Sequence, residues 1–197
     1  MELGDIAKIK TGLVLSRKKA KSKYDVKAKY RLLSLRNISD ECLINTDSFE
    51  EFNSNDELDD HYFTKEGDVL MRLSHPNTSV YIGKEHNGLL IPSYFAIIKV
   101  DVDKVLPEYI AWYLNTFEVK KELERSQSGS RIPSTNKNVL KALPVVMTTI
   151  SKQKAFIELL RLHQQEKHLY KRLIEEKEVW FKEISKQIIK GYELGGE

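Results

Sequence analysis

A stretch of 40 residues, Ser151 to Lys190, most constrains the fold of this chain because it lacks both Gly and Pro and is densely charged. Apolar residues recur in it at steps of three, four and seven, a spacing that places them along one side of an α-helix. They form two neighbouring rows, the first made of Leu159, Leu162, Leu169, Leu173 and Trp180, the second of Phe156, Leu160, Tyr170, Ile174, Phe181, Ile184 and Ile188. The sequence therefore predicts one long amphipathic helix.

This helix would be roughly 60 Å long at 1.5 Å per residue, which exceeds the width of a compact domain of this size. Much of its apolar surface therefore needs a partner. Two adjacent rows indicate packing on more than one neighbour, unlike the single seam of a two-stranded coiled coil. Charged residues at 166–167 and 176–177 interrupt both rows, which argues against a regular coiled coil. The helix is expected to associate.

The first part of the chain predicts an α/β (α+β) domain with a mixed, mostly antiparallel sheet, because short apolar segments alternate with Gly, Asn and Pro turns. The expected strands lie around Ile9 and at 29–38, 42–46, 69–73, 80–82, 89–91 and 95–100. A helix is expected to open at Leu106-Pro107-Glu108 and to end by Arg125. We thus expect two parts, 1–145 and 146–197.

Charge is distributed unevenly, although the net charge is only +3. Residues 1–31 contain ten Lys or Arg and three acidic residues, a net charge of +7, whereas residues 40–68 contain eleven Asp or Glu and one Lys, a net charge of −10. The pattern predicts one basic face and one acidic face, the basic one suited to a polyanion such as nucleic acid. Solvated loops would give the same pattern.

Three segments contain the residue types that contact nucleic acid. The first is a basic loop that would neutralise phosphates, with Arg17, Lys18, Lys19, Lys21 and Lys23. The second follows a buried strand and offers groups that hydrogen bond to base edges, with Arg72, Ser74, His75 and Asn77. The third is a small polar loop, with Ser130, Arg131 and Lys137. Each segment alone is also typical of an ordinary turn or connection, so their coexistence carries the prediction.

Signals of catalysis are largely missing. The only cysteine, Cys42, excludes an internal disulfide and a cysteine-based zinc site. The sequence contains no nucleotide-binding, hydrolase or metalloprotease motif, and its five histidines lack metal-ligand spacing. We expect a chain that binds and does not catalyse, with no cofactor or metal of its own. A nuclease with an inconspicuous metal site is the alternative, which metal-dependent cleavage by the chain would reveal.

The chain shows neither a signal peptide nor a stretch approaching 18 apolar residues. A cytoplasmic protein without membrane contact is therefore expected.

Six segments occur in an order that resembles the specificity subunits of type I restriction-modification systems. They read LGDIAKIKTG, GDVLMRLS, GLLIPSYFAIIKVD, LPEYIAWYLNT, GSRIPSTNKNVLKALPV and SKQKAFIELL. The resemblance covers essentially the whole chain and corresponds to one target recognition domain plus one long spacer helix. Such subunits usually contain two of these units in tandem, so the chain resembles a half-subunit or a truncated subunit. The proline-rich approach to the spacer helix is reduced here to Leu143-Pro144.

The resemblance implies that residues 1–145 read a short half-site in double-stranded DNA without catalysing a reaction. It implies that residues 146–197 form a spacer helix, through which two copies would dimerise. We expect the contacts of this homodimer to be made by Leu159, Leu162, Leu169, Leu173, Trp180, Phe181 and Ile184. Two-fold symmetry then predicts two inverted half-sites whose separation the helix sets. Methyltransferase subunits, which would carry S-adenosylmethionine, and a restriction subunit are the expected further partners.

A protein-interaction adaptor is the competing hypothesis. In that interpretation the acidic residues of 40–68 and the long helix would bind proteins, and DNA recognition would be absent. Salt-dependent binding to random duplex DNA would count against it.

Overall fold

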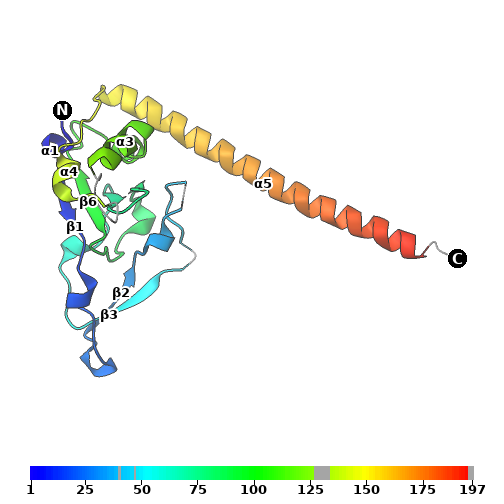
Figure 1. Ribbon diagram of the computed structural model, residues 1–197, viewed down its shortest axis with the longest axis horizontal. Coiled ribbons are helices and arrows are strands. Elements are labelled where there is room, and N and C mark those ends of the chain that lie inside the picture. Colours follow the sequence, from blue (N-terminus) through cyan, green and yellow to red (C-terminus); the bar gives the residue numbers. More distant parts are fainter. Residues whose placement is uncertain (40, 47, 127–133, 195–197) are drawn as a thin grey trace. The chain divides into compact units, whose positions relative to one another are not determined.

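The computed structural model describes residues 1–39, 41–46, 48–126 and 134–194 and contains two compact units, Met1–Gln153 and Lys154–Glu197 (Figure 1). The helices are α1 (Leu3–Ile6), α2 (Pro107–Tyr113), α3 (Phe117–Ser126), α4 (Lys137–Lys141) and α5 (Ile150–Leu194). The strands are β1 (Ala7–Thr11), β2 (Ala28–Leu32), β3 (Glu50–Ser54), β4 (Val69–Arg72), β5 (Ser79–Tyr81) and β6 (Phe95–Val100). Single 3₁₀ turns lie at Leu15–Arg17, Lys23–Asp25, Leu35–Asn37, Asp60–Tyr62 and Lys84–His86.

A four-stranded sheet of order β1-β6-β4-β5 forms the centre of the N-terminal unit, and all of its pairs are antiparallel. Its inner strands β4 and β6 are almost continuously apolar and buried, as expected for strands covered on both faces. One apolar cluster contains Leu33, Leu70, Val80, Ile82, Leu89, Ile91, Phe95 and Ile97. Helix α2 packs against β4 and β5.

A second sheet consists of β2 and β3 alone, which pair antiparallel with Ala28 opposite Ser54 and Leu32 opposite Glu50. It lies over a smaller apolar cluster of Leu13, Leu32, Phe52 and Leu90. Leu90 forms isolated bridges with Leu32 and Phe63, and its neighbours Leu89 and Ile91 belong to the first cluster. The expected fold class, mostly antiparallel sheet followed by one long helix, is confirmed.

Three expected elements differ in detail. The 42–46 segment is not a strand, since Asn37 Nδ2 donates to the Asn45 and Ser48 carbonyls and holds it in a turn (3.3 and 2.7 Å). The 89–91 segment pairs only through isolated bridges. The strand expected at 29–38 is shorter, since β2 ends at Leu32. The first difference arises from the hydrogen bonds of the Asn37 side chain to the backbone, which compete with strand pairing.

The helix expected from 106 to 125 is interrupted between α2 and α3. Asn115 causes the interruption, because its side chain pairs with the backbone of β5: Oδ1 accepts from the Ser79 N–H at 2.9 Å, and Nδ2 donates to the Ser79 carbonyl at 2.7 Å. The same amide also donates to the Ala111 carbonyl. A tertiary contact thus ends a helix whose apolar spacing continues.

The basic and acidic stretches do not form two separate faces. Because β2 pairs with β3, the stretches lie side by side, and Lys29 Nζ contacts Glu51 Oε1 at 2.9 Å. Lys18 Nζ likewise contacts Asp56 Oδ2 at 2.6 Å. Part of each charge run therefore neutralises the other, which weakens the adaptor hypothesis.

The first turn of α5 belongs to the N-terminal unit. Gln153 is fully buried; its Oε1 accepts from the Leu106 N–H at 2.8 Å, and its Nε2 donates to the Thr148 carbonyl at 2.9 Å. The helix has 45 residues, or about 68 Å at the usual rise. Among the described residues, no helix is both long and apolar enough to cross a membrane.

Candidate nucleic-acid interface

The loop after β4 lies beside the described end of the third predicted segment, residues 134–137. Ser74 forms a bridge with Ser134, and the Thr135 N–H donates to the Leu73 carbonyl at 2.7 Å. The loop after β4 is therefore attached to the segment that opens α4. Lys137, the exposed first residue of α4, follows directly. Ser130 and Arg131 lie outside the described residues.

The loop after β4 presents polar groups from the end of a buried strand. Arg72 Nε donates to Ser74 Oγ at 2.9 Å, which orients a half-buried guanidinium. His75 is exposed and precedes Pro76 in a cis peptide bond. Arg, Ser and His supply the donors and acceptors that match base edges, and a rigid strand positions them.

Asn77 occupies a different position from the one we predicted. It is only 3% exposed, and Nδ2 donates to the Arg72 and Leu73 carbonyls at 3.2 and 3.1 Å. Its φ of 54° lies in the left-handed region, which Asn tolerates better than most residues. Asn77 therefore shapes the loop, and we withdraw it from the predicted base contacts. Its place directly after a Pro is the sequence signal of a turn residue.

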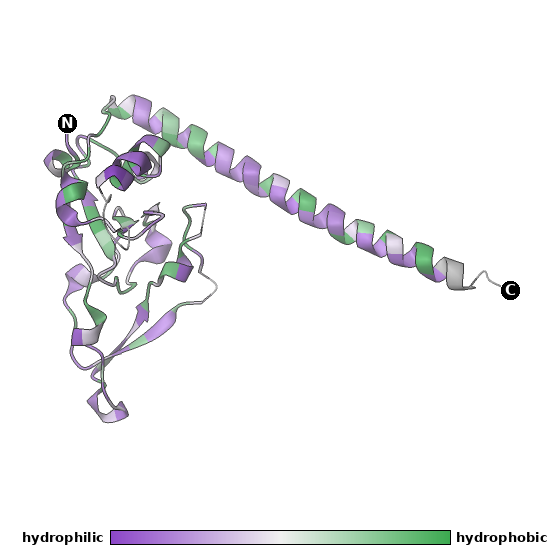
Figure 2. Ribbon diagram, in the orientation of Figure 1, coloured by the Kyte–Doolittle hydropathy of each residue, from purple (hydrophilic) through white to green (hydrophobic). Residues whose placement is uncertain are grey.

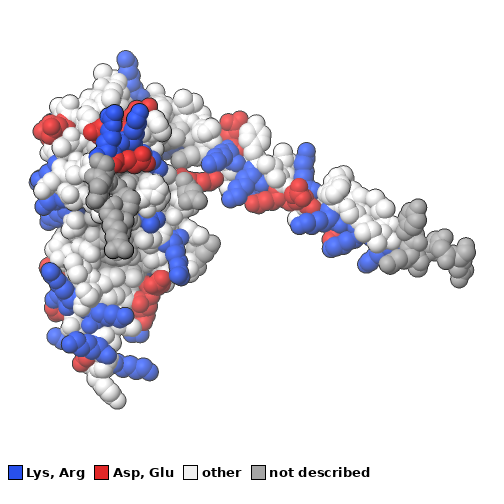
Figure 3. Space-filling view, in the orientation of Figure 1, with Lys and Arg blue, Asp and Glu red and all other residues white. Residues whose placement is uncertain are grey.

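The basic segment forms a loop pinned to β3 at both ends. The Ala20 N–H donates to the Asn53 carbonyl and the Lys27 N–H to the Ser54 carbonyl, each at 2.9 Å. We call residues 20–27 the basic finger; it extends beyond the end of β2 and β3 in Figure 1. Figure 3 shows Lys and Arg side chains gathered over this end of the N-terminal unit. The exposed cations predicted here are Arg17, Lys19, Lys21 and Lys23.

Lys18 differs from these cations because Asp56 already neutralises it. The hydrogen bond to the Asp56 carboxylate raises the pKa of Lys18 above its usual value, and the same hydrogen bond lowers the pKa of Asp56. Lys18 could bind a phosphate only by releasing Asp56. We therefore expect it to contribute less to phosphate binding than the neighbouring cations do. The partner lies 38 positions away, which no local pattern reveals.

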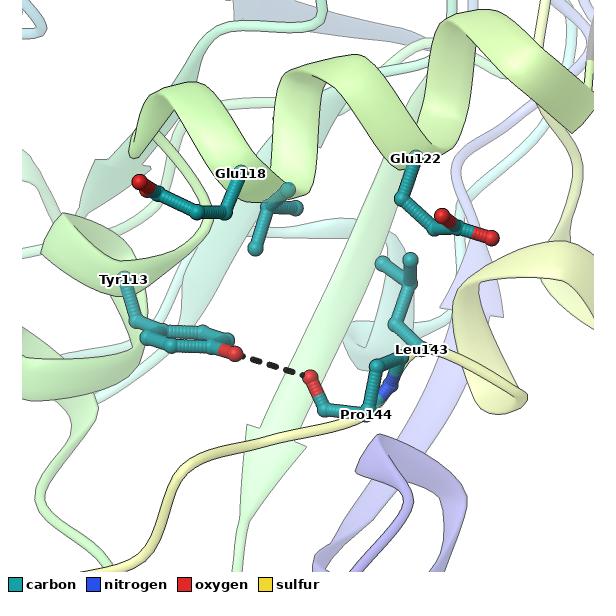
Figure 4. Close-up of a pocket in the computed structure, with 6 residues that line it drawn as sticks. Tyr113, Glu118, Glu122, Leu143 and Pro144 are labelled. Atoms are coloured by element: carbon teal, nitrogen blue, oxygen red, sulfur yellow. Dashed lines mark hydrogen bonds between the residues drawn. The ribbon is translucent and has the colours of Figure 1, made fainter.

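A shallow hollow of about 220 Å³ lies elsewhere on the N-terminal unit, lined by Tyr113, Glu118, Val119, Glu122, Leu143 and Pro144. Tyr113 Oη donates to the Pro144 carbonyl at 3.0 Å, and the Glu118 and Glu122 carboxylates point away from each other (Figure 4). The negative charge of Glu118 and Glu122 would repel a polyanion. Their two carboxylates do not form a pair. Within the described ranges, no three His, Cys, Asp or Glu residues are grouped to hold a metal.

The apolar rows of α5 are largely open to solvent. Leu159, Leu162, Leu169, Leu173, Trp180 and Phe181 are each 48 to 64% exposed. Ile184 is half-buried. Apolar and polar residues alternate along the coloured part of the helix (Figure 2). Exposed apolar residues that recur along a helix of this length are typical of an association surface.

The solved chains similar to this one include the following three. The HsdS subunit from Thermoanaerobacter tengcongensis has a TM-score of 0.66 and 13% identity, covering 88% of this chain and 43% of its own. A chain from a study of complex assembly and conformational transition of the type I R-M system gives the same values. The type I restriction-modification S subunit from M. genitalium has a TM-score of 0.53 and 10% identity, covering 84% of this chain and 38% of its own.

No protein-family model and no curated protein sequence matches this chain. At 10 to 13% identity the structural likenesses establish the fold, and they agree with the resemblance of the six sequence segments. The chain spans less than half the length of the solved chains it matches. It therefore has the fold of somewhat less than half of a type I restriction-modification specificity subunit.

Proposed function

We propose that this chain is a DNA sequence-recognition subunit of a type I restriction-modification system. The observation that carries the proposal is the likeness of 88% of the chain to an HsdS subunit. A fold alone does not define a function. The proposal is therefore also supported by the polar loop after β4, which lies beside the residues that open α4, and by an exposed apolar helix.

In this function the N-terminal unit reads one half-site. Arg72, Ser74 and His75 would contact base edges, since they stand together at the end of β4. The exposed cations would bind phosphates and fix the register, a role that carries no sequence information. These are Arg17, Lys19, Lys21, Lys23 and Lys137.

Helix α5 would join two copies through its apolar rows. A closed symmetric dimer presents the same unit twice, so the DNA site would contain two identical half-sites in inverted orientation. Methyltransferase subunits, which would bind S-adenosylmethionine, and a restriction subunit would assemble on this scaffold. The chain itself would supply recognition and spacing but no catalysis.

Selection of bound duplexes from a random pool tests the proposal, using the full chain alone and together with a type I methyltransferase subunit. We expect an enriched site of two inverted half-sites with a constant spacer. Arg72→Ala should relax the preference at one base pair per half-site at a cost of roughly 1–3 kcal/mol, whereas Lys137→Ala should weaken all sequences alike. A pool that enriches no sequence in either preparation contradicts the proposal.

The length of α5 tests the spacer role separately. An insertion of seven helix-forming residues between Gln164 and Gln165 keeps the apolar rows approximately in phase. It lengthens each helix by about 10 Å, equivalent to roughly three base pairs. The selected spacer should change while the half-sites stay the same. An unchanged spacer in a chain that still dimerises would show that α5 does not set the distance.

A further inference from the structure

Tyr24 is the most exposed aromatic residue among those described, with 100% of its side chain open to solvent. It stands at the middle of the basic finger, between Lys23 and Asp25. Other aromatic residues of the N-terminal unit, such as Tyr30 and Phe63, pack against one another. Tyr24 therefore adds nothing to the folded core, and its ring is free to contact a ligand.

The finger holds Tyr24 in a defined turn. The Ser22 N–H donates to Asp25 Oδ2 at 3.1 Å, and the Asp25 N–H donates to the Ser22 carbonyl at 3.2 Å. The ends of the finger are fixed to Asn53 and Ser54 of β3. A ring displayed on a loop that is closed in this way loses less conformational entropy on binding than one on a free chain.

The surroundings of Tyr24 are cationic. Lys19, Lys21, Lys23 and Lys27 are exposed, and within the described part of the chain none of them forms an ion pair. The Asp25 carboxylate accepts a backbone hydrogen bond within the turn. An exposed aromatic ring on a loop that also carries exposed Lys residues matches nucleic acid, in which phosphates border flat bases and sugars.

We propose that the ring of Tyr24 enters a groove of the DNA duplex while Lys21 and Lys23 hold the phosphates that border this groove. Inserted side chains of this kind contact sugars and partly unstack base steps, and they favour deformable sequences. Tyr24 is thus a specificity-determining residue for the site of the proposed function, on which this inference rests. A membrane surface fits less well, because a single aromatic residue on a finger that is otherwise polar offers little apolar area to a bilayer.

Four variants of the full chain test this role on the best duplex selected by the wild-type protein. Tyr24→Ala should lower affinity about tenfold with an unchanged salt dependence, because no charge is removed. Lys21→Ala should lower the slope of log K against log salt by about one. Tyr24→Phe should bind within about twofold of wild type, because the ring remains. Phe117→Ala is the matched control, since Phe117 is 73% exposed and lies beside Lys121, away from the finger.

Each outcome decides between the two proposals. If the wild-type chain selects a site and Tyr24→Ala binds it as well as wild type, the role of Tyr24 is wrong and the proposed function stands. If the wild-type chain selects no site, both fail. A Tyr24→Ala variant that loses affinity for phosphatidylserine vesicles but not for the duplex would assign the finger to a membrane. Unchanged thermal unfolding of Tyr24→Ala, expected from its full exposure, excludes misfolding as the cause of any loss.

Discussion

The N-terminal unit and the part of α5 that follows Gln153 differ in where their apolar side chains lie. In the unit, Leu70, Phe95 and Ile97 are almost completely buried between sheet, loops and helices. In α5, Leu169 is 62% exposed and Leu173 is 48% exposed. The first region buries its apolar surface within one chain, whereas the second leaves its apolar surface exposed to solvent. Stability of the unit should therefore be independent of concentration, and order in α5 should depend on association.

Replacement of Leu169 and Leu173 by Gln is the strongest test of this difference. Each of these two side chains is about half exposed, and its burial in a dimer should contribute about 1 kcal/mol. A dimer contains four of them, two from each copy, so their replacement should weaken it by about 4 kcal/mol, or roughly 1,000-fold in Kd. Sedimentation equilibrium measures the change. Gln164→Glu with Lys171→Gln, on the opposite side of the helix, should leave dimerisation intact. A dimer that tolerates the Leu substitutions would refute association through these residues.

Gln153→Ala tests where the two regions divide. The substitution leaves the Leu106 N–H and the Thr148 carbonyl without their buried partner, so the free energy of unfolding of the N-terminal unit should fall by about 3 kcal/mol. Urea unfolding followed through Trp112 fluorescence, with Trp180 replaced by Phe in every variant, measures this loss. The exposed neighbour Lys152, changed to Ala, should have almost no effect. Equal stability of both variants would place the first turn of α5 outside the unit.

Asn77→Ala tests whether the loop after β4 is as rigid as the core. Two backbone carbonyls lose a donor, and Ala is strained at a φ of 54°, so the free energy of unfolding should fall by about 2 kcal/mol. His75→Ala, which removes an exposed side chain of the same loop, should change it by less than about 0.5 kcal/mol. Thermal unfolding of both variants gives the comparison. A stable Asn77→Ala variant would return Asn77 to the predicted base contacts.

The Lys18–Asp56 pair should give the smallest effect, because both side chains are partly exposed. Its hydrogen bond to Lys18 lowers the pKa of Asp56 in the folded chain below the usual 3.8. The stability that the pair contributes is therefore present above pH 3.8 and is lost as pH falls through the folded-state pKa. Asp56→Asn should lower the unfolding midpoint slightly at pH 7, and this difference should shrink on acidification. A difference that stays constant with pH would show that Asp56 acts through packing.

Features that depend on residues close together in the sequence could be predicted, whereas features that depend on contacts between distant residues could not. Helix α5 was expected from Ser151 and begins at Ile150, because side-chain spacing along one helix is a local property. The fold class and strands β4, β5 and β6 were also predicted. The break at Asn115, the neutralisation of Lys18 and the inward position of Asn77 were not, since each depends on a partner that the fold brings close.

The candidate interface shows the same division. Residue types alone selected the loop after β4 and the basic segment, because Arg, Lys, Ser and His carry the chemistry that contacts DNA. They did not single out Tyr24, which becomes conspicuous only once the finger is pinned to β3 and the ring is seen to be fully exposed.

The sequence by itself determined that this chain contains a long helix with unmatched apolar rows, a mostly antiparallel domain and three polar segments suited to nucleic acid. Only the tertiary structure decided which of these groups are available. It buried Asn77, paired Lys18 and Lys29 with acidic residues of the neighbouring segment, and left the finger and α5 open. The physical reason is that spacing and composition are encoded locally, whereas burial and charge pairing depend on contacts between residues far apart in the chain.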